Sequence, residues 1–199
     1  MEKKKLLVMD DDTVTRELIQ DLLQYDCDCI SAQNGVEGLS YLEQHPGQVD
    51  LIVVNSPNAY LGNVPNVKKI KDFQDVFIAD KAFEELKGKK LSFKELLNYP
   101  ILMLDRKSTT SEYLHNLFLQ NQLDLVPEIE LSSNDLLIDL ARIGLGIAFI
   151  PDFCLSQTSD SDSLFIVETK EVLPERELVI AYNEKVPISK AAQEFLSYF

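Results

Sequence analysis

Three consecutive carboxylates, Asp10, Asp11 and Asp12, follow an apolar run near the start of the chain. Carboxylate oxygens at the end of a strand can ligate Mg²⁺, which prefers hard anionic ligands. A later apolar run, residues 49–54, ends at Asn55. An amide oxygen lacks the charged lone pair that attacks phosphorus, so phosphorylation at Asn55 is not expected. Asp10 and Asp11 therefore allow weak Mg²⁺ binding, or they form a solvated acidic strand end.

Hydroxyl and amide side chains gather at two predicted helix starts, in the runs 108–110 and 132–134. Thr109 and Glu112 are three residues apart, which is the spacing of a capping box. Free backbone N–H groups and the helix dipole favour anions at such positions. The same side chains can instead cap their own helices, at about 1 kcal/mol each. The two roles are compatible, and both remain open from the sequence.

The elements that must position these groups alternate between strand and helix, which predicts parallel sheets built by right-handed crossovers. The opening is predicted as strand, helix, strand, helix and strand over residues 4–10, 13–25, 27–32, 35–45 and 49–54. Residues 56–72 have no helical period and many turn residues, so they are predicted to be irregular. Further strands are predicted over 73–80, 101–105, 127–131, 147–151 and 177–183, and further helices over 92–99, 108–123, 133–144 and 189–199.

The composition of the chain disfavours several classes of function. The formal net charge of −14 disfavours nucleic-acid binding, and no apolar run is long enough to span a bilayer. We therefore expect a cytoplasmic protein with neither nucleic-acid nor membrane partners. The cysteines at 27, 29 and 154 lack zinc-ligand spacing, and His45 and His115 stand in no triad motif. The sequence predicts no cofactor, apart from the weak Mg²⁺ binding, and no enzyme activity.

Residues 4–55 resemble the receiver domain of bacterial response regulators. The motifs that carry the resemblance are "LLVMDDDTVTREL", "AQNGVEGLSYL" and "VDLIVVN". The resemblance puts Asp10 and Asp11 on the magnesium ligands and Asn55 on the phosphoacceptor. Asn55 departs from the family's aspartate, and the family's later threonine or serine and lysine have no counterpart here. The resemblance thus implies a receiver that cannot be phosphorylated.

Residues 56–199 resemble the effector-binding domain of LysR-type transcriptional regulators. The motifs are "KELLNYPILMLDRKSTTSEYL", "LSSNDLLIDLARIGLGIAFIP" and "ELVIAYNEKVPISKAAQEFLSYF". This resemblance implies a two-lobed, periplasmic-binding-protein-like fold with a small-molecule pocket between the lobes. It nominates Ser108, Thr109, Thr110 and Asn134 as pocket residues. In that family the chain segments can also pair, which allows a homodimer.

The two resemblances together predict a chimera joined near residue 55, engineered rather than formed by natural recombination, with no catalytic or DNA-binding activity. The predicted fold class is α/β, two-lobed, with parallel doubly wound sheets and a flavodoxin-like first half. Lobe 1 would comprise 1–98 and 172–199, and lobe 2 would comprise 99–171. The alternatives are an effector-binding module for a small organic anion and a degenerate receiver. Under the first alternative Thr13 and the carboxylates beside it would face the pocket, where their charge weakens anion binding.

Overall fold

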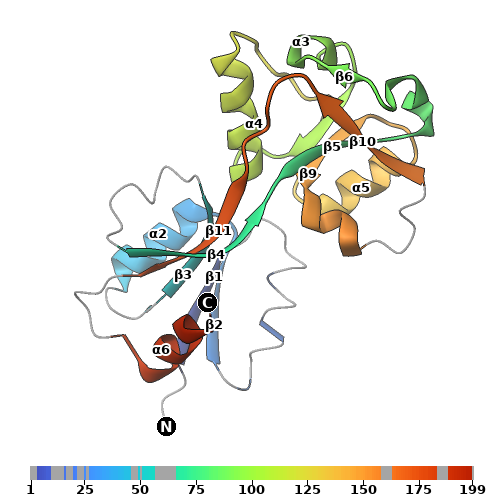
Figure 1. Cartoon of the computed structure of the whole chain (residues 1–199). Helices are drawn as coiled ribbons and strands as arrows, with labels where there is room; N and C mark the ends of the chain where they lie inside the picture. Colours follow the sequence, from blue (N-terminus) through green and yellow to red (C-terminus); the bar gives the residue numbers. More distant parts are fainter. Residues whose placement is uncertain are drawn as a thin grey trace. The chain divides into compact units, whose positions relative to one another are not determined.

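The computed structural model describes residues 4–9, 16, 20–21, 25, 27–45, 49, 51–56, 66–157, 163–182 and 188–198. The chain forms two compact units (Figure 1). Unit 1 comprises Met1–Asp72 and Arg176–Phe199, and unit 2 comprises Phe73–Glu175. Both units combine helices with β-sheet, so the predicted two-part α/β organisation is confirmed.

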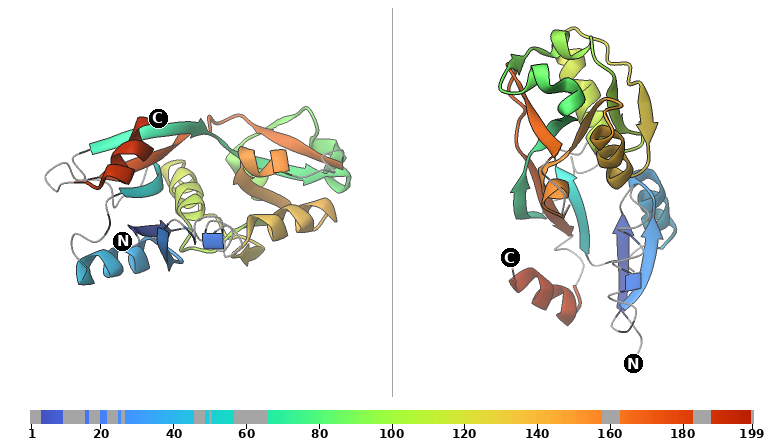
Figure 2. Two further views of the ribbon diagram at one scale, coloured as in Figure 1. Left: turned by 90° about the horizontal axis from the view of Figure 1, so that it is seen from below. Right: turned by 90° about the vertical axis from the view of Figure 1, so that its right-hand side faces the viewer.

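Unit 1 opens with two parallel strands and a helix beside them. β1 (Lys4–Met9) pairs in parallel with β2 (Cys27–Ala32). α2 (Gly35–Gln44) begins after Asn34, whose side-chain oxygen accepts a hydrogen bond from an amide of the first turn at 2.9 Å. The helix packs against both strands (Figure 2), and a Cβ at Gly38 would meet the flexible side chain of Met9 in β1. Glycine at this position therefore leaves room for the Met9 side chain beside the helix.

The last strand of the chain is the central strand of a second, three-stranded sheet in unit 1. β11 (Arg176–Tyr182) lies between β3 (Leu51–Ser56) and β4 (Asn66–Phe73). α6 (Lys190–Ser197) begins at the cap Ser189, and its apolar side packs on buried side chains of β3 and β11. β3, β4, β11 and α6 thus share one core.

Unit 2 contains a six-stranded mixed sheet in the order β6-β10-β5-β9-β7-β8. Its strands are β5 (Asp75–Asp80), β6 (Lys90–Leu91), β7 (Ile101–Leu104), β8 (Ile129–Leu131), β9 (Ile147–Pro151) and β10 (Leu164–Thr169). β7 is parallel to β8 and β9, whereas β5 is antiparallel to β9 and β10. β5, β7 and β9 are buried along their whole length, as strands covered on both faces are.

Helices cover both faces of this sheet. They are η2 (Lys81–Leu86), α3 (Phe93–Leu96), α4 (Thr109–Gln120), α5 (Asn134–Arg142) and η3 (Asp152–Gln157). α3 and α4 contribute to one core layer, which contains Phe77, Met103 and Phe149 of the sheet. α5 contributes to the other layer, which contains Ile78 and Leu102. Helices α4 and α5 therefore lie on opposite faces.

The prediction of parallel doubly wound sheets is wrong for several strand pairs. β3 and β11 are antiparallel, and Asn55, expected at the end of its strand, lies within β3 opposite Leu178. A flavodoxin-like first half would give β3 parallel neighbours only. β11 enters unit 1 from unit 2 rather than through a crossover helix of unit 1, which leaves it free to run in the opposite direction.

The boundaries between the units also differ from those predicted. The sequence places the first boundary after residue 98, whereas the chain divides after Asp72. β4 and β5 follow one another with only Gln74 between them, and β5 pairs inside the sheet of unit 2. Residues 75–98 therefore belong to unit 2. The second boundary, predicted after 171, lies after Glu175.

Two strands and one cap were also predicted wrongly. β4 falls in the segment expected to be irregular, and β10 in a segment for which no strand was expected. The cap of α4 is Ser108 rather than Thr109. A complete capping box occurs instead between Ser92 and Glu95 at the start of α3.

None of the helices in the described part of the chain has the length and apolar character needed to cross a bilayer.

Candidate functional site

Two adjacent parallel strands of unit 2 end side by side and send the chain to opposite faces of the sheet. Leu104, the last residue of β7, pairs with Leu131, the last residue of β8. The amide of Asp105 donates to the carbonyl of Leu131 at 2.8 Å, which joins the two strand ends. α4 follows β7 on one face, and α5 follows β8 on the other. Ligands of α/β proteins bind outside the carboxyl ends of strands where the chain reverses in this way.

We call this region, residues 104–111 and 131–136, the helix-start edge. A tight turn carries the chain from β7 into α4 there. The amide of Ser108 donates to the carbonyl of Asp105 at 3.0 Å, and the amide of Lys107 donates to the Asp105 carboxylate at 2.9 Å. The Ser108 hydroxyl then accepts from the amide of Thr110 at 3.2 Å and caps the helix. Ser108 and Thr110 are buried and Thr109 is partly buried, so the cap is protected from solvent.

Two polar atoms at the helix-start edge are buried without a hydrogen-bond partner among the described residues. They are Oγ of Ser111 and Oδ1 of Asn134. Ser111 is 0% exposed in the first turn of α4, and Asn134 is the first residue of α5. A buried polar atom with no partner costs about 1–3 kcal/mol. A polar ligand that bonded to these atoms would remove that cost.

The charges near the helix-start edge are balanced rather than strongly positive. Nε of Arg106 lies 3.6 Å from Oε1 of Glu130 in an exposed pair. Burial lowers the pKa of His115 on α4, and Arg106 lowers this pKa further, while Glu130 and Asp124 oppose the shift. Because the neutral form of His115 is favoured, attraction of an anion here depends on the helix N-termini and the hydroxyl groups.

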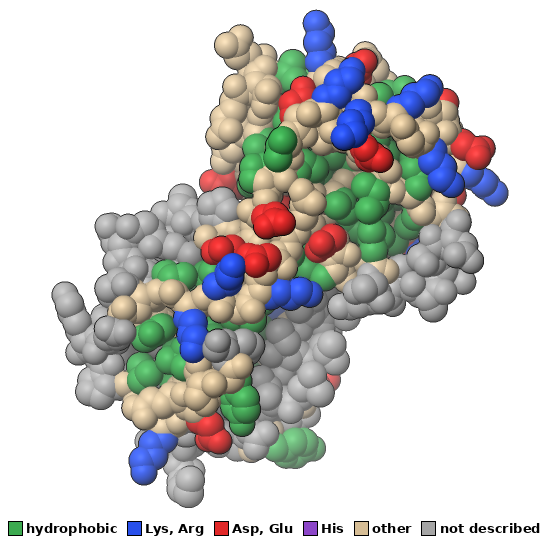
Figure 3. Space-filling model, in the orientation of Figure 1, with side chains coloured by type: hydrophobic (Ala, Val, Ile, Leu, Met, Phe, Trp, Pro, Cys, Tyr) green, Lys and Arg blue, Asp and Glu red, His purple; other side chains and the backbone are tan. Residues whose placement is uncertain are grey.

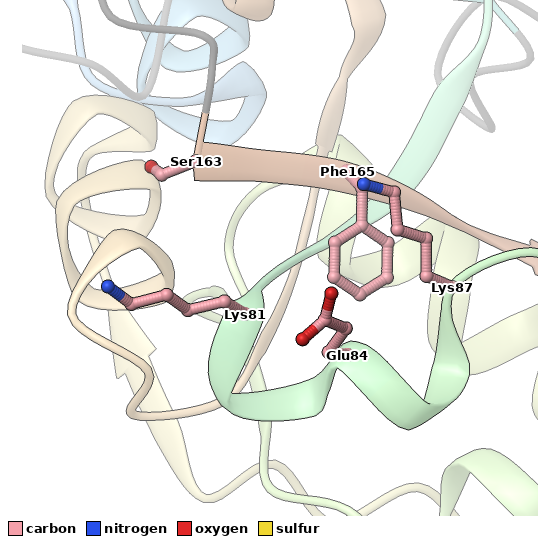
Figure 4. Close-up of a pocket in the computed structure, with 5 residues that line it drawn as sticks. All are labelled: Lys81, Glu84, Lys87, Ser163 and Phe165. Carbon is pink, nitrogen blue, oxygen red and sulfur yellow. The ribbon is translucent and has the colours of Figure 1, made fainter.

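A hollow lies toward the opposite edge of the same sheet, near β10. It has a volume of about 430 Å³ and is lined by Lys81, Glu84, Lys87, Ser163 and Phe165 (Figure 4). The ammonium group of Lys87 lies 5.8 Å from the centre of the Phe165 ring. The lysines and Glu84 are exposed, and lysine and arginine side chains gather around α3 and β6 on the face in Figure 3. This hollow is part of a solvated, mixed-charge surface.

The nominated residues that the structure describes lie in different parts of the chain. Ser108, Thr109, Thr110 and Asn134 all lie at the helix-start edge. Asp10, Asp11 and Thr13 lie outside the described residues. Asn55 lies in β3, in unit 1. Within the described residues, no group of three or more histidine, cysteine or acidic side chains could hold a metal ion.

Sequence reasoning missed Ser111. Its hydroxyl is the second polar atom of the helix-start edge, although it follows directly after the nominated run 108–110. Ser111, Leu114 and Phe118 are fully buried and follow the spacing of one helix face. That spacing is visible in the sequence and predicts the burial of Ser111. The missing hydrogen-bond partner depends on tertiary packing and is not visible there.

The sequence model of one protein family, the LysR substrate binding domain, matches residues 42–199. The chain belongs to this family. Among curated relatives of this family, the HTH-type transcriptional activator CmpR of Synechocystis sp. is 25% identical over 165 residues, which is 83% of this chain and 50% of CmpR. The chain therefore spans about half the length of the curated relative it matches.

Solved structures of LysR-type domains share the fold along nearly the whole chain. The regulatory domain of Synechocystis CcmR, solved in complex with 2-PG, superposes with a TM-score of 0.75 at 22% identity and covers 98% of this chain and 94% of its own. A reduced form of OxyR from N. meningitidis gives 0.68 at 19% identity, with 98% and 92% covered. The effector binding domain of QuiR, in complex with shikimate, gives 0.68 at 13% identity, with 99% and 94% covered.

These similarities support the LysR-type alternative better than the predicted chimera. The likeness to single LysR-type domains extends through the first 55 residues, where the receiver resemblance predicted a different fold. A strand–helix–strand opening is common to both folds, so the pattern that suggested a receiver does not discriminate between them. The LysR-type part of the prediction is supported, and neither the receiver domain nor the junction is. Membership in a family of regulatory domains also supports the prediction that the chain is not an enzyme.

Proposed function

We propose that this chain is the effector-binding part of a LysR-type transcriptional regulator and that its effector is a small organic anion bound at the helix-start edge. The observation that carries the proposal is the pair of buried, unpartnered atoms, Ser111 Oγ and Asn134 Oδ1, at the starts of two helices. Helix N-termini attract negative charge through their free N–H groups. The hydroxyl of Ser111 would donate a hydrogen bond to the anion, whereas Oδ1 of Asn134 accepts and would bond to a hydroxyl group of the ligand.

The ligands of the relatives support the same chemical class. The CcmR regulatory domain was solved with 2-PG and the QuiR domain with shikimate. Shikimate is a carboxylate that carries hydroxyl groups, which suits a site of N–H donors and hydroxyls. The identity with these domains is 22% or less, so the two ligands serve as probes of the class rather than as the expected effector.

Calorimetry with 2-PG, shikimate and other small carboxylates tests the proposal. We expect at least one of them to bind in the millimolar range or tighter. Ser111→Ala should weaken that binding by about fivefold or more, because one hydrogen bond is worth about 1 kcal/mol. The free energy of unfolding should not fall, because the hydroxyl that is removed has no partner in the free protein.

Asn134→Asp gives the complementary result. A carboxylate at the first position of α5 favours the helix, so stability should be equal or higher, whereas anion binding should weaken by at least about tenfold. Asn116→Asp, an exposed position on α4, adds the same charge away from the helix-start edge and should leave binding within about twofold. Equal losses in the two variants, or no binding of any small anion, would reject the proposed site.

We also propose that the domain associates with a second copy through the outer side of α5. Leu136 lies on this helix and Ile143 is its C-cap, seven residues later, and the two are 52% and 70% exposed. Such a stripe on a helix already packed through its inner side is available to a partner. Light scattering across a concentration series should show a dimer that Ile143→Glu dissociates. Val172→Glu, at an 82% exposed position, is the matched control.

The degenerate receiver is the other alternative for the start of the chain, because the family match begins at residue 42 and leaves residues 4–41 outside it. A receiver origin would give Asp10 and Asp11 a residual affinity for Mg²⁺. Asn55→Asp combined with acetyl phosphate is the direct test. Covalent labelling of the new carboxylate would support a receiver-type site, and its absence would leave the effector-binding role alone.

A further inference from the structure

The chain passes between the two units twice, after Asp72 and after Glu175. The segment that leads to the second passage is fixed to unit 2 along most of its length. This segment, residues 170–175, joins β10 to β11 and is called the connector here. The amide of Lys170 donates to the carbonyl of Leu91 at 2.8 Å. The Glu171 carboxylate accepts from the amide of Phe93 at 2.9 Å, at the start of α3. The connector is therefore held to unit 2 at its first residues.

The two passages are also joined to each other. Gln74, the single residue between β4 and β5, donates from Nε2 to the carbonyl of Leu173 at 2.7 Å. The carbonyl of Gln74 accepts from the amide of Asp152 at 2.8 Å, at the end of β9. Leu173 itself packs against the core of unit 2. Both passages are thus attached to unit 2 before the chain leaves it.

The last attachment of the connector comes from α4. The hydroxyl of Tyr113 donates to the carbonyl of Pro174 at 2.9 Å, one residue before the unit boundary. Tyr113 lies one helical turn after Thr109, on the same side of the helix as that first residue. The Tyr113 ring packs on the same core as Leu173. The Tyr113 side chain therefore links the first turns of α4 directly to the backbone of the connector.

We infer that Tyr113 couples the occupancy of the helix-start edge to the connector, and so to the freedom of the chain where it passes between the units. This role rests on the proposed function, because it gives the effector a route from the start of α4 to the unit boundary. Hinges are formed by a few residues at the ends of elements. The attachments of the connector extend to Pro174, one residue before the unit boundary.

Proteolysis of the connector tests this coupling without any ligand. A glutamate-specific protease cleaves after Glu171 and Glu175, and the rate follows the population in which the connector is released. Tyr113→Phe should raise this rate by about fivefold, as expected for one lost hydrogen bond. Tyr99→Phe removes a hydroxyl from another tyrosine packed on the same core and should leave the rate unchanged. Cleavage after Glu84 reports general loosening of unit 2 and should not change.

A double-mutant cycle tests the link to the helix start. Ser108→Ala removes the cap of α4 and should also accelerate connector cleavage, whereas Ser133→Ala, which removes the cap of α5, should not. In the Tyr113→Phe background the effect of Ser108→Ala should vanish, because the connection is already absent. The inference would be overturned if the cleavage rate of the double variant rose by the product of the two single-variant factors. An unchanged cleavage rate in Tyr113→Phe would overturn it as well. Failure of the anion-binding assays would instead reject the proposed function and leave this result standing.

Discussion

The backbone of Gly146 packs so closely against the carbonyl of Pro100 that a Cβ at position 146 would stand 2.5 Å from that oxygen. The contact joins the start of β9 to the start of β7, where the amide of Ile147 donates to the same carbonyl at 2.8 Å. The Gly-Leu-Gly sequence at 144–146 is therefore a packing feature. Gly144 ends α5 at a φ of 75°, and Gly146 permits the approach of the two strands.

Gly146→Ala should destabilise the protein by about 1–3 kcal/mol, because the added methyl group forces the two central strands apart. Urea unfolding measures the change in the free energy of unfolding. Gly88→Ala is the control: Gly88 has a φ of 73° and no atom within 4 Å of the added carbon. Gly88→Ala should lower the free energy of unfolding only by the cost of holding alanine in a left-handed backbone conformation, about 1–2 kcal/mol. The crystal structure of Gly88→Ala should show the strands unmoved, whereas that of Gly146→Ala should show a displaced Pro100 carbonyl.

The stability of unit 2 should fall at acid pH through Glu95. Its carboxylate accepts from Nζ of Lys170 at 2.8 Å and from the amide and hydroxyl of Ser92 at 2.7 and 2.8 Å. These bonds lower the pKa of Glu95 from its ordinary value of 4.5 to about 2. Because the folded pKa is the lower one, this stabilisation is complete above pH 4.5 and is lost as the pH falls toward 2.

Glu95→Gln should therefore flatten the dependence of the free energy of unfolding on pH across that window. Glu85→Gln, at an exposed position in η2, removes the same charge and serves as the control. Urea unfolding at a series of pH values measures both. The same slope below pH 4.5 in wild type and Glu95→Gln would contradict the assigned hydrogen bonds.

The core beneath α4 depends on one aromatic pair. The rings of Phe93 and Phe118 stack with their centres 4.7 Å apart, and both side chains are buried. Phe118→Ala should cost about 3–5 kcal/mol, because it removes a large buried ring and leaves a cavity. Leu119→Ala, the adjacent and exposed position, should change the free energy of unfolding by no more than about 0.5 kcal/mol. Thermal or urea unfolding of the pair checks the contrast.

How far the sequence predicts this fold depends on whether the signal is local. The runs "ILML" and "IAFIP" were recognised as strands because they are apolar throughout and buried on both faces. β4 was missed because it is an edge strand whose lysines at 68, 69 and 71 hide its alternation. The antiparallel pairing of β3 with β11 joins residues more than 120 positions apart, and no local pattern encodes that direction.

Some features of the candidate site follow from local sequence patterns, and others depend on packing between distant segments. Ser108 and Ser133 cap their helices through bonds within a few residues, so a local pattern indicated both helix starts. That the two helices begin beside each other follows from the pairing of β7 with β8. The unpartnered state of Ser111 and the bond from Tyr113 to Pro174 depend on packing between distant segments. These features therefore required coordinates.

His115 should make the protein less stable as the pH falls below 6.5. Burial lowers the pKa of His115 from 6.5, and the positive charge of Arg106 lowers it further, against Glu130 and Asp124. His115 of the unfolded chain therefore takes up a proton near pH 6.5, whereas His115 of the folded chain takes it up only at a lower pH. Stability is lost as the pH falls from 6.5 to the folded pKa. His115→Gln should remove this slope in urea unfolding, whereas His45→Gln, in unit 1, should retain it.

Arg106→Gln separates the charge effect from burial. Removing Arg106 deletes one cause of the lowered pKa and releases Glu130 from its exposed ion pair, so the carboxylates act on His115 unopposed. The pKa of His115 should rise toward its ordinary value, and the loss of stability below pH 6.5 should shrink. Proton NMR titration of the His115 ring measures the pKa directly. A fall in the pKa would show that Arg106 acts on His115 through packing rather than through its charge.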